Sequence, residues 1–249
     1  MKVTRLAPSP TGPLHIGHLF HIIHLLKFAK SNNAKIILRI EDHDSARSRR
    51  EHTLDILKQL RNWGIFSYIC NISNQRTRFQ RYQNILRLLK NQVFYCQCSR
   101  KDLMMRVGKN EYDGHCRNKS FKSGHVRLNL AHSKADPILI NSEGDFSYFF
   151  CNVVDDIDQS VTHVIRGTDI EHYTEMQKYF FSILGYHPPE YIHHELILDS
   201  AGKKVSKRKQ DKLALEKVDH ESLKFLADKL GIRGEFDYTS LGDILDLTS

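Results

Sequence analysis

Residues 5–18 read RLAPSPTGPLHIGH, and this stretch decides how the N-terminal part of the chain folds. It places three prolines and two glycines between a short, partly apolar segment at 2–7 and a long apolar segment that begins at Gly17. A strand that ends in a rigid turn and continues into a helix places the helix N-terminus at the carboxyl edge of a sheet, where ligands bind. The exposed N–H groups and the dipole of such a helix attract phosphate.

Two histidines and a glycine in this turn are candidates for nucleotide binding. Gly17 would let a phosphate or an adenine approach the backbone closely, and His15 and His18 could donate hydrogen bonds to charge that develops on phosphates. The alternative is a rigid turn that carries ordinary surface histidines. His18, His21 and His24 also recur at a three-residue spacing, but no carboxylate or thiol completes a metal-binding set there.

The segments outside this turn alternate between strand and helix patterns. AKIILRI at 34–40 is a near-continuous apolar run, typical of a buried parallel strand. Helix signals follow at 51–63 and 77–90. Later in the chain we expect strands at 149–156, 161–165 and 191–198, and helices near 173–184 and 221–231. This alternation predicts an α/β fold with a doubly wound, parallel, Rossmann-type sheet.

Composition and charge restrict the class of protein. The chain has 249 residues, of which 40% are hydrophobic and 27% charged, an ordinary soluble globular composition. No apolar run approaches the length of a membrane span, and polar residues and prolines follow Lys2 too soon for a signal-peptide core, so we expect no membrane association. The formal net charge of +8 favours a polyanionic partner such as nucleic acid, although a protein can also be basic by chance.

The cysteines indicate a reducing compartment. There are five of them, an odd number, and no secretion signal accompanies them, so we expect free thiols or a metal site in a cytoplasmic protein. Cysteines, glycines and short strand-like pieces dominate from about Gln92 to Phe146. We therefore divide the chain into the first half of a catalytic domain at 1–91, an inserted subdomain at 92–146, a second half at 147–208 and a short helical segment at 209–249.

A second candidate motif, KKVSKRK at 203–209, follows the last expected strand. Lysines beside a serine on a loop can clamp a triphosphate while charge moves onto pyrophosphate. The alternative for such a charge run is a solvated basic loop.

Together the two motifs resemble those of the class I aminoacyl-tRNA synthetases, HIGH and KMSKS. HIGH is intact at 15–18, and Lys204–Val205–Ser206–Lys207–Arg208 stands for KMSKS, with Val205 in place of methionine and Arg208 in place of the last serine. RLAPSPTGPLHIGH, RIEDHD (39–44) and VVDDIDQSVTHVIRGTD (153–169) resemble the glutamyl branch. The resemblance implies an ATP site in which Mg²⁺ accompanies the nucleotide and His15, His18 and Lys207 stabilise the developing charge. Its implied ATP-binding residues are His15, Gly17, His18, Lys204, Ser206 and Lys207.

Within that branch the chain resembles the short paralogue family, the glutamyl-queuosine tRNA(Asp) synthetases. Only about forty residues follow the KMSKS-like loop, too few for a helical anticodon-binding domain. The resemblance implies a monomer that activates L-glutamate with ATP and transfers it to the queuosine base in the anticodon loop of tRNA(Asp). The rivals are a truncated glutamyl-tRNA synthetase that charges the tRNA 3′ end, a small-molecule nucleotidyltransferase and a non-catalytic tRNA-binding module.

The inserted subdomain carries a candidate structural zinc site. In the paralogue family a C-x-C and a Y-x3-C supply four ligands, which here are Cys96, Cys98, Tyr112 and Cys116. Since histidine is a more usual zinc ligand than tyrosine, His115 is the rival for the fourth position. The alternative is a small core of reduced cysteines.

The resemblance also implies a glutamate pocket. Arginine's planar fork suits a carboxylate, and Arg5 and Arg166 are expected to bind the substrate carboxylates. Glu41 would pair with the α-ammonium, and Ser9, the backbone near Ala7 and Tyr148 would add contacts. Without the resemblance, Arg5 and Glu41 could instead form a buried structural ion pair, and Tyr148 could be a core residue. The chain departs from the family at Phe149–Asn152, where small or aliphatic residues are usual.

Overall fold

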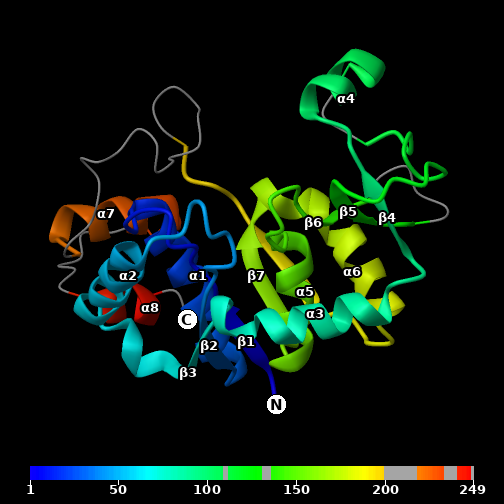
Figure 1. Ribbon diagram of the computed structural model, residues 1–249. Helices are drawn as coiled ribbons and strands as arrows, with labels where there is room; N and C mark the ends of the chain where they lie inside the picture. The colour runs from blue at the N-terminus through cyan, green and yellow to red at the C-terminus, as the bar shows by residue number, and fades with distance from the viewer. Residues whose placement is uncertain (109–111, 131–135, 199–217, 233–239, 248–249) are drawn as a thin grey trace. The chain divides into compact units, whose positions relative to one another are not determined.

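The computed structural model describes two compact units (Figure 1). It covers residues 1–108, 112–130, 136–198, 218–232 and 240–247. The first unit comprises Met1–Asp42, Arg47–Asn74 and Gln159–Ser249, and the second comprises His43–Ala46 and Gln75–Asp158.

The first unit is built on parallel strands. The strands described there are β1 (Val3–Leu6), β2 (Lys35–Ile40), β3 (Ile69–Asn74), β7 (His163–Gly167) and β8 (Glu190–His194). Parallel pairing joins β1 to β2, β2 to β3, and β7 to β8. β7 lies beside β1, because the N–H of Thr162 donates to the carbonyl of Val3 at 2.9 Å. The parallel α/β sheet predicted from the sequence is confirmed.

The order of these strands reverses beside β1. The chain proceeds from β1 outward through β2 to β3, and then returns to the other side of β1 with β7 and β8. In parallel α/β sheets, ligands bind at the carboxyl ends of the strands beside such a reversal. RLAPSPTGPLHIGH starts within β1, so the predicted nucleotide turn begins at this position.

Helices cover the sheet of the first unit. They are α1 (Ile16–Asn32), α2 (Arg50–Asn62), α6 (Thr174–Ile183), α7 (His220–Lys229) and α8 (Leu241–Leu247). α1 ends at Asn33, whose φ of 47° is left-handed and whose N–H donates to carbonyls of the last turn. Four of these helices and the sheet share one hydrophobic core, in which Leu19 and Ile23 of α1 and Leu226 of α7 have no exposed surface. Each such side chain contributes roughly 1.5–3 kcal/mol by its burial.

The second unit contains an antiparallel sheet. Its elements are α3 (Phe79–Leu88), β4 (Val93–Cys96), α4 (Arg100–Val107), β5 (His125–Leu128), β6 (Ile138–Ile140) and α5 (Tyr148–Asp158). β5 lies between β4 and β6. This compact unit is longer than the insertion expected at 92–146, because α3 and α5 pack within it.

The strand expected at 149–156 is wrong, since this segment forms helix α5. An unbroken apolar run does not by itself distinguish a buried strand from a buried helix. Ser147 caps the helix, because its Oγ accepts a hydrogen bond from the N–H of Phe150 at 3.3 Å. Asn152, Asp155 and Asp156 recur at i, i+3 and i+4, which places these buried polar residues on one helix face. Asn152, which was expected in a strand, is thus one of the buried polar residues of α5.

In the part of the chain that the structure describes, no helix combines the length and apolar composition needed to cross a membrane.

Candidate active site

The start of α1 brings together the three HIGH residues singled out from the sequence, His15, Gly17 and His18. His15 precedes the helix in an extended conformation, and its Nδ1 accepts a hydrogen bond from the N–H of Gly17 at 3.1 Å. The Nδ1 of His18 accepts from the N–H of His15, also at 3.1 Å. Because both Nδ1 atoms accept, each neutral ring carries its proton on Nε2, the nitrogen that can donate to a phosphate oxygen.

Gly17 is needed for this arrangement. A Cβ at this position would lie 3.0 Å from Cε1 and 3.1 Å from Nδ1 of His15, closer than ordinary van der Waals contact. The glycine therefore lets the His15 imidazole fold back over the helix N-terminus. This is a more specific reason for glycine than the close phosphate approach expected from the sequence.

Gln59 of α2 holds the backbone of the turn at Leu14, and no motif in the sequence pointed to this residue. Its Oε1 accepts from the N–H of Leu14 at 2.8 Å, and its Nε2 donates to the Leu14 carbonyl at 3.1 Å. Gln59 is buried beside Ile56 and Leu60 on the apolar face of α2. A polar residue on that face was the available signal.

Glu41 lies directly after β2, next to the turn. Its N–H donates to the Pro8 carbonyl at 3.0 Å, and its Oε2 accepts from the hydroxyl of Ser9 at 3.5 Å. Arg39 lies with its Nη2 3.8 Å from Oε1 of Glu41, and both side chains are buried. The structure thus groups Ser9 and Glu41 beside Ala7 and Pro8, and adds Arg39, which sequence analysis missed.

Arg5 and Arg166 occupy neighbouring strands. The Nη1 of Arg5 donates to the Ile165 carbonyl at 3.4 Å, directly before Arg166 in β7. Both arginines are only 4% exposed. Two buried guanidinium groups at one sheet edge form a strongly cationic site, suited to a ligand with two carboxylates.

Four further side chains from α6 and β8 hold Arg166. It donates to Gln177 Oε1 at 2.7 Å, to Thr174 Oγ1 at 2.8 Å and to His193 Nε2 at 3.2 Å. Its guanidinium also lies over the ring of Tyr191, 4.6 Å from the centroid. Burial and the neighbouring Arg166 lower the pKa of His193, so the imidazole is neutral and can accept the hydrogen bond.

Two sets of predicted site residues are not among those described at the turn after β1. Tyr148 belongs to the second unit, where it begins α5 and its ring centroid lies 6.5 Å from that of His43. Its contact with glutamate therefore stays a prediction. Lys204, Ser206 and Lys207 of the KMSKS-like loop lie outside the described residues.

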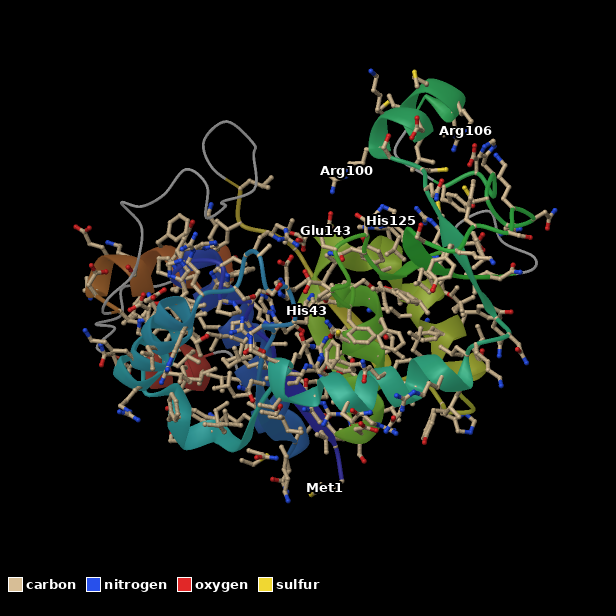
Figure 2. The ribbon with its side chains drawn as sticks, in the orientation of Figure 1. Met1, His43, Arg100, Arg106, His125 and Glu143 are labelled. Atoms are coloured by element: carbon tan, nitrogen blue, oxygen red, sulfur yellow. The ribbon has the colours of Figure 1, made fainter. Side chains whose placement is uncertain are left out.

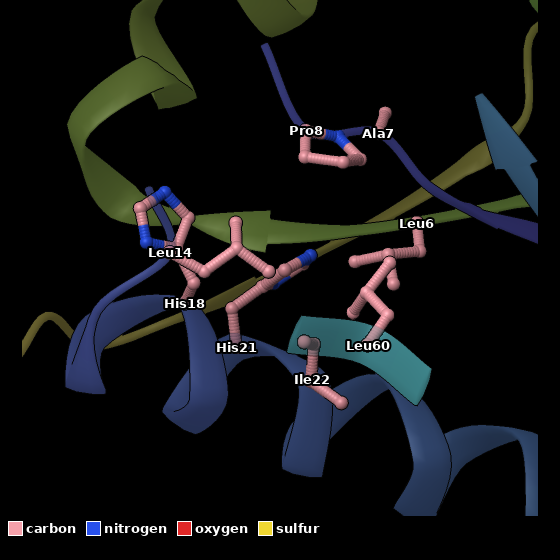
Figure 3. A pocket seen from close by; sticks show the side chains of 8 residues that line it. All are labelled: Leu6, Ala7, Pro8, Leu14, His18, His21, Ile22 and Leu60. Carbon is pink, nitrogen blue, oxygen red and sulfur yellow. The ribbon is translucent and has the colours of Figure 1, made fainter. Parts of the chain in front are cut away.

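A small cavity of about 60 Å³ lies below the end of β1 (Figure 3). Two imidazoles, those of His18 and His21, are the polar side chains in a lining that is otherwise apolar. The remaining lining residues are Leu6, Ala7, Pro8, Leu14, Ile22 and Leu60. The cavity therefore lies between the turn after β1 and the first two turns of α1.

In the second unit, three cysteines form a cluster that could hold a metal ion. The Sγ atoms of Cys96, Cys98 and Cys116 lie within 4.8 Å of one another, and all three residues are buried. The hydroxyl of Tyr112 lies beside this cluster, since it accepts a hydrogen bond from the N–H of Cys116 at 2.7 Å. His115 is exposed, and its Nε2 lies 2.5 Å from Nζ of Lys119. Of the two candidates for a fourth ligand, Tyr112 is the one that faces the cysteines.

The chemistry of this cluster fits a thiophilic ion such as zinc. Arg106, at the end of α4 (Figure 2), donates from Nη2 to Cys98 Sγ at 3.1 Å. Burial and the hydrogen bond with Cys116 raise the pKa of Cys98 to about 12. Burial also raises the pKa of Cys116, but hydrogen bonds from the Gln97 backbone and Cys98 outweigh it and lower that pKa. Three buried thiols so close together favour a cation that replaces their protons.

The catalytic-domain family of class I tRNA synthetases (E and Q) matches residues 2–135 and 123–228. The chain is 35% identical over 247 residues to the glutamate–tRNA ligase of Buchnera aphidicola subsp. Cinara cedri, covering 84% of this chain and 51% of the relative. It is 33% identical over 241 residues to that of Francisella tularensis subsp. novicida, with the same coverage. The chain thus spans about half the length of these relatives.

The fold is also similar to those of solved tRNA synthetase structures. A glutamate tRNA ligase from Elizabethkingia meningosepticum in complex with its amino acid has a TM-score of 0.70 and 25% identity, covering 86% of this chain and 53% of that one. The glutamate-tRNA synthetase of Elizabethkingia anophelis has a TM-score of 0.71 and 25% identity, covering 86% and 54%. A tyrosyl-tRNA synthetase from Archaeoglobus fulgidus, with a TM-score of 0.58, 16% identity and coverage of 98% and 80%, shares the fold alone.

Proposed function

We propose a function from one premise: the chain belongs to the class I tRNA synthetases, in the family for glutamate and glutamine. The protein activates L-glutamate with ATP, without tRNA, to form glutamyl-adenylate and pyrophosphate. The observation that carries this proposal is the set of buried charges at one sheet edge, Arg5, Arg166 and Glu41, in the same compact unit as the HIGH turn. Free glutamate carries the complementary set, two carboxylates and one ammonium.

In this proposal the two arginines bind the carboxylates of glutamate. Arg166 is held by Gln177 and Thr174, so little side-chain freedom is lost when a carboxylate arrives. Glu41 pairs with the ammonium, and the Ser9 hydroxyl and the backbone at Ala7 add hydrogen bonds.

The first step is an in-line displacement at the α-phosphate of ATP. An oxygen of the glutamate α-carboxylate forms the new bond to phosphorus, and the bond to the pyrophosphate oxygen breaks. The Nε2–H groups of His15 and His18 donate to the phosphate oxygens, with Gly17 keeping His15 in place, and Lys204, Ser206 and Lys207 bind the departing pyrophosphate. Mg²⁺ bound to ATP supplies further charge neutralisation.

For the second step we propose the finer assignment, transfer of glutamate to queuosine in tRNA(Asp). A hydroxyl of the queuosine ring attacks the adenylate carbonyl, and AMP leaves. The support is the set Cys96, Cys98, Tyr112 and Cys116, which resembles the zinc ligands of the queuosine paralogues, together with the net charge of +8 for a tRNA partner. Zinc in this set would be structural, because four protein ligands leave no open position.

Two tRNA pools test this function, one carrying queuosine and one from cells that lack it. We expect labelled glutamate to enter only the queuosine pool. Equal labelling of both pools would indicate charging of the 3′ end instead. Glutamate-dependent exchange of pyrophosphate into ATP without tRNA tests the first step, and its absence would overturn the proposal.

A further inference from the structure

The cysteine cluster of the second unit has a charged neighbour at the far end of helix α4. Cys98 stands two positions before α4 begins, and Arg106 belongs to the last turn of that helix. The Arg106 side chain reaches back toward the start of the helix, because its Nη2 donates to Cys98 Sγ at 3.1 Å. One helix thus leads from a candidate metal ligand to a cation that contacts the same sulfur.

Asp113 holds this guanidinium in place. Arg106 donates through Nε to Oδ2 of Asp113 at 2.6 Å and through Nη2 to Oδ1 at 3.2 Å. Oδ1 also accepts from the backbone N–H of His115 at 3.2 Å. Asp113 stands between Tyr112 and Cys116 in the sequence, so the segment that carries these two candidate ligands is tied to α4.

This contact matters for α4 because the helix packs little of its own surface. Of its eight residues, all of which the structure describes, Leu103 is the one that is buried. Met104 and Met105 are 54% and 69% exposed. A helix this short is only marginally stable without tertiary contacts. The contact of Arg106 with Cys98 and Asp113 therefore helps to hold α4 beside the cluster.

A bound metal ion would leave the cluster with excess negative charge. A thiol that coordinates a metal loses its proton, and three thiolates carry more charge than one divalent ion neutralises. The three cysteines are buried, where an uncompensated charge is costly. Arg106 places a positive charge on one sulfur, whereas the guanidinium of Arg127 lies over the ring of Tyr112, 4.0 Å from its centroid.

We infer that Arg106, held by Asp113, is a positioning residue of the metal site, which donates a hydrogen bond to the Cys98 thiolate and offsets the charge of the metal-bound cluster. The inference rests on the structural metal site in the proposed function and not on the activation of glutamate. Partners of this kind orient a metal ligand and tune the affinity of the site without touching the ion.

Zinc affinity measures this role directly. In competition with a chromogenic chelator, Arg106→Gln should bind zinc about tenfold more weakly than wild type, a modest loss for such a partner because the Arg106 side chain is 30% exposed. Arg106→Lys should recover part of the loss, since it keeps the charge but not the planar fork that joins Asp113 to Cys98. Asp113→Asn should weaken binding less, and combining it with Arg106→Gln should add little.

Arg100→Gln is the matched control, since it removes the same charge from the other end of α4. Figure 2 labels both arginines, and Arg100 is exposed at the first position of the helix, two positions after Cys98. This variant should bind zinc as tightly as wild type. Equal weakening in Arg100→Gln and Arg106→Gln would mean that zinc responds only to the general charge of the unit, and would overturn the inference.

Cobalt in place of zinc separates a contact with the sulfur from a brace on the helix. A hydrogen bond stabilises the sulfur electrons, so the sulfur-to-cobalt charge-transfer band should move to longer wavelength in Arg106→Gln and stay in place in Arg100→Gln. After chelation, Arg106→Gln and wild type should unfold at nearly the same urea concentration, because a partly exposed ion pair contributes little by itself. An unshifted band, or an equal loss of stability with and without metal, would overturn the inference.

The metal measurements also distinguish this inference from the proposed function. Wild type that binds neither zinc nor cobalt would overturn the metal site and, with it, the role of Arg106. Zinc bound equally well by wild type and Arg106→Gln would overturn the inference alone. Weaker zinc binding and a shifted cobalt band in Arg106→Gln would support it whether or not the protein exchanges pyrophosphate or labels tRNA.

Discussion

The Sγ atoms of Cys98 and Cys116 lie 3.4 Å apart although eighteen positions separate them in the sequence. Such a separation is close enough for both sulfurs to bind one ion and longer than a disulfide bond. Gly124, directly before β5, lets the chain pass close to Cys96. Its φ of 120° excludes most side chains, and a Cβ there would lie 2.6 Å from the Cys96 carbonyl oxygen.

We expect purified protein to contain about one equivalent of zinc and to melt at a lower temperature after chelation. Cys98→Ser and Cys116→Ser should remove most of the metal, whereas Cys70→Ser, at an exposed cysteine outside the cluster, should keep it. Tyr112→Phe should weaken zinc binding and His115→Ala should not. Elemental analysis decides between these ligands, and metal-free protein with unchanged stability would refute the site.

His15 has two separable roles, because its ring also caps α1. His15→Ala should slow pyrophosphate exchange by about 100-fold, the usual loss when one donor to a developing charge is removed. It should also cost about 1 kcal/mol of stability through the lost cap. His15→Asn restores a good capping residue, so it should unfold like wild type while remaining slow. Exchange at the wild-type rate in either variant would remove His15 from the mechanism.

Lys207→Ala tests the KMSKS-like loop. We expect exchange to fall by about 100-fold with an unchanged unfolding transition, because the lysine would act on the triphosphate and not on the core. Lys209→Ala, in the same basic run but outside the motif, should retain near-normal exchange. Similar small losses in both variants would indicate a solvated basic loop.

Substitution of Asp155 should destabilise the second unit strongly. Its fully buried carboxylate accepts from Tyr82 Oη at 2.9 Å, Gln75 Nε2 at 2.8 Å and Arg78 Nε at 2.6 Å. Asp155→Ala should cost on the order of 3 kcal/mol, because it leaves the guanidinium of Arg78 without its buried partner. Asp158→Asn, at a partly exposed carboxylate that pairs with Arg78 and Arg81, should cost about 1 kcal/mol or less. Urea unfolding compares them, and equal costs would contradict the assigned burial.

The α1 histidines should make folding sensitive to acid. The pKa of His24 falls from 6.5 to about 4 on folding, chiefly through burial. The unfolded chain therefore binds a proton that the folded chain refuses, so this contribution to stability is complete above pH 6.5 and is lost as pH falls toward 4. The free energy of unfolding should decline over that window in wild type and less steeply in His24→Leu. Parallel pH profiles would show that His24 titrates normally.

Local patterns in the sequence were enough to locate most elements of the first unit. The segments predicted at 2–7, 34–40, 51–63 and 173–184 correspond to β1, β2, α2 and α6, because hydrophobic periodicity and turn residues act over a few neighbours. The same locality placed His15, Gly17 and His18 at a helix N-terminus. The expectation of an inserted subdomain at 92–146 likewise rested on local composition, because most of the cysteines lie in that segment.

Long-range packing decided the rest, because it depends on partners that are distant in sequence. Whether 149–156 formed a strand or a helix depended on partners for its buried polar residues, such as Tyr82 and Gln75 for Asp155. Gln59 became a partner of the turn after β1 only when α2 packed against Leu14, forty-five positions earlier. His21 gained a partner for its Nδ1 only when β8 brought His194 beside it, 173 positions away. A hydrogen bond that fixes a side chain in place requires both partners, and the fold alone brings them together.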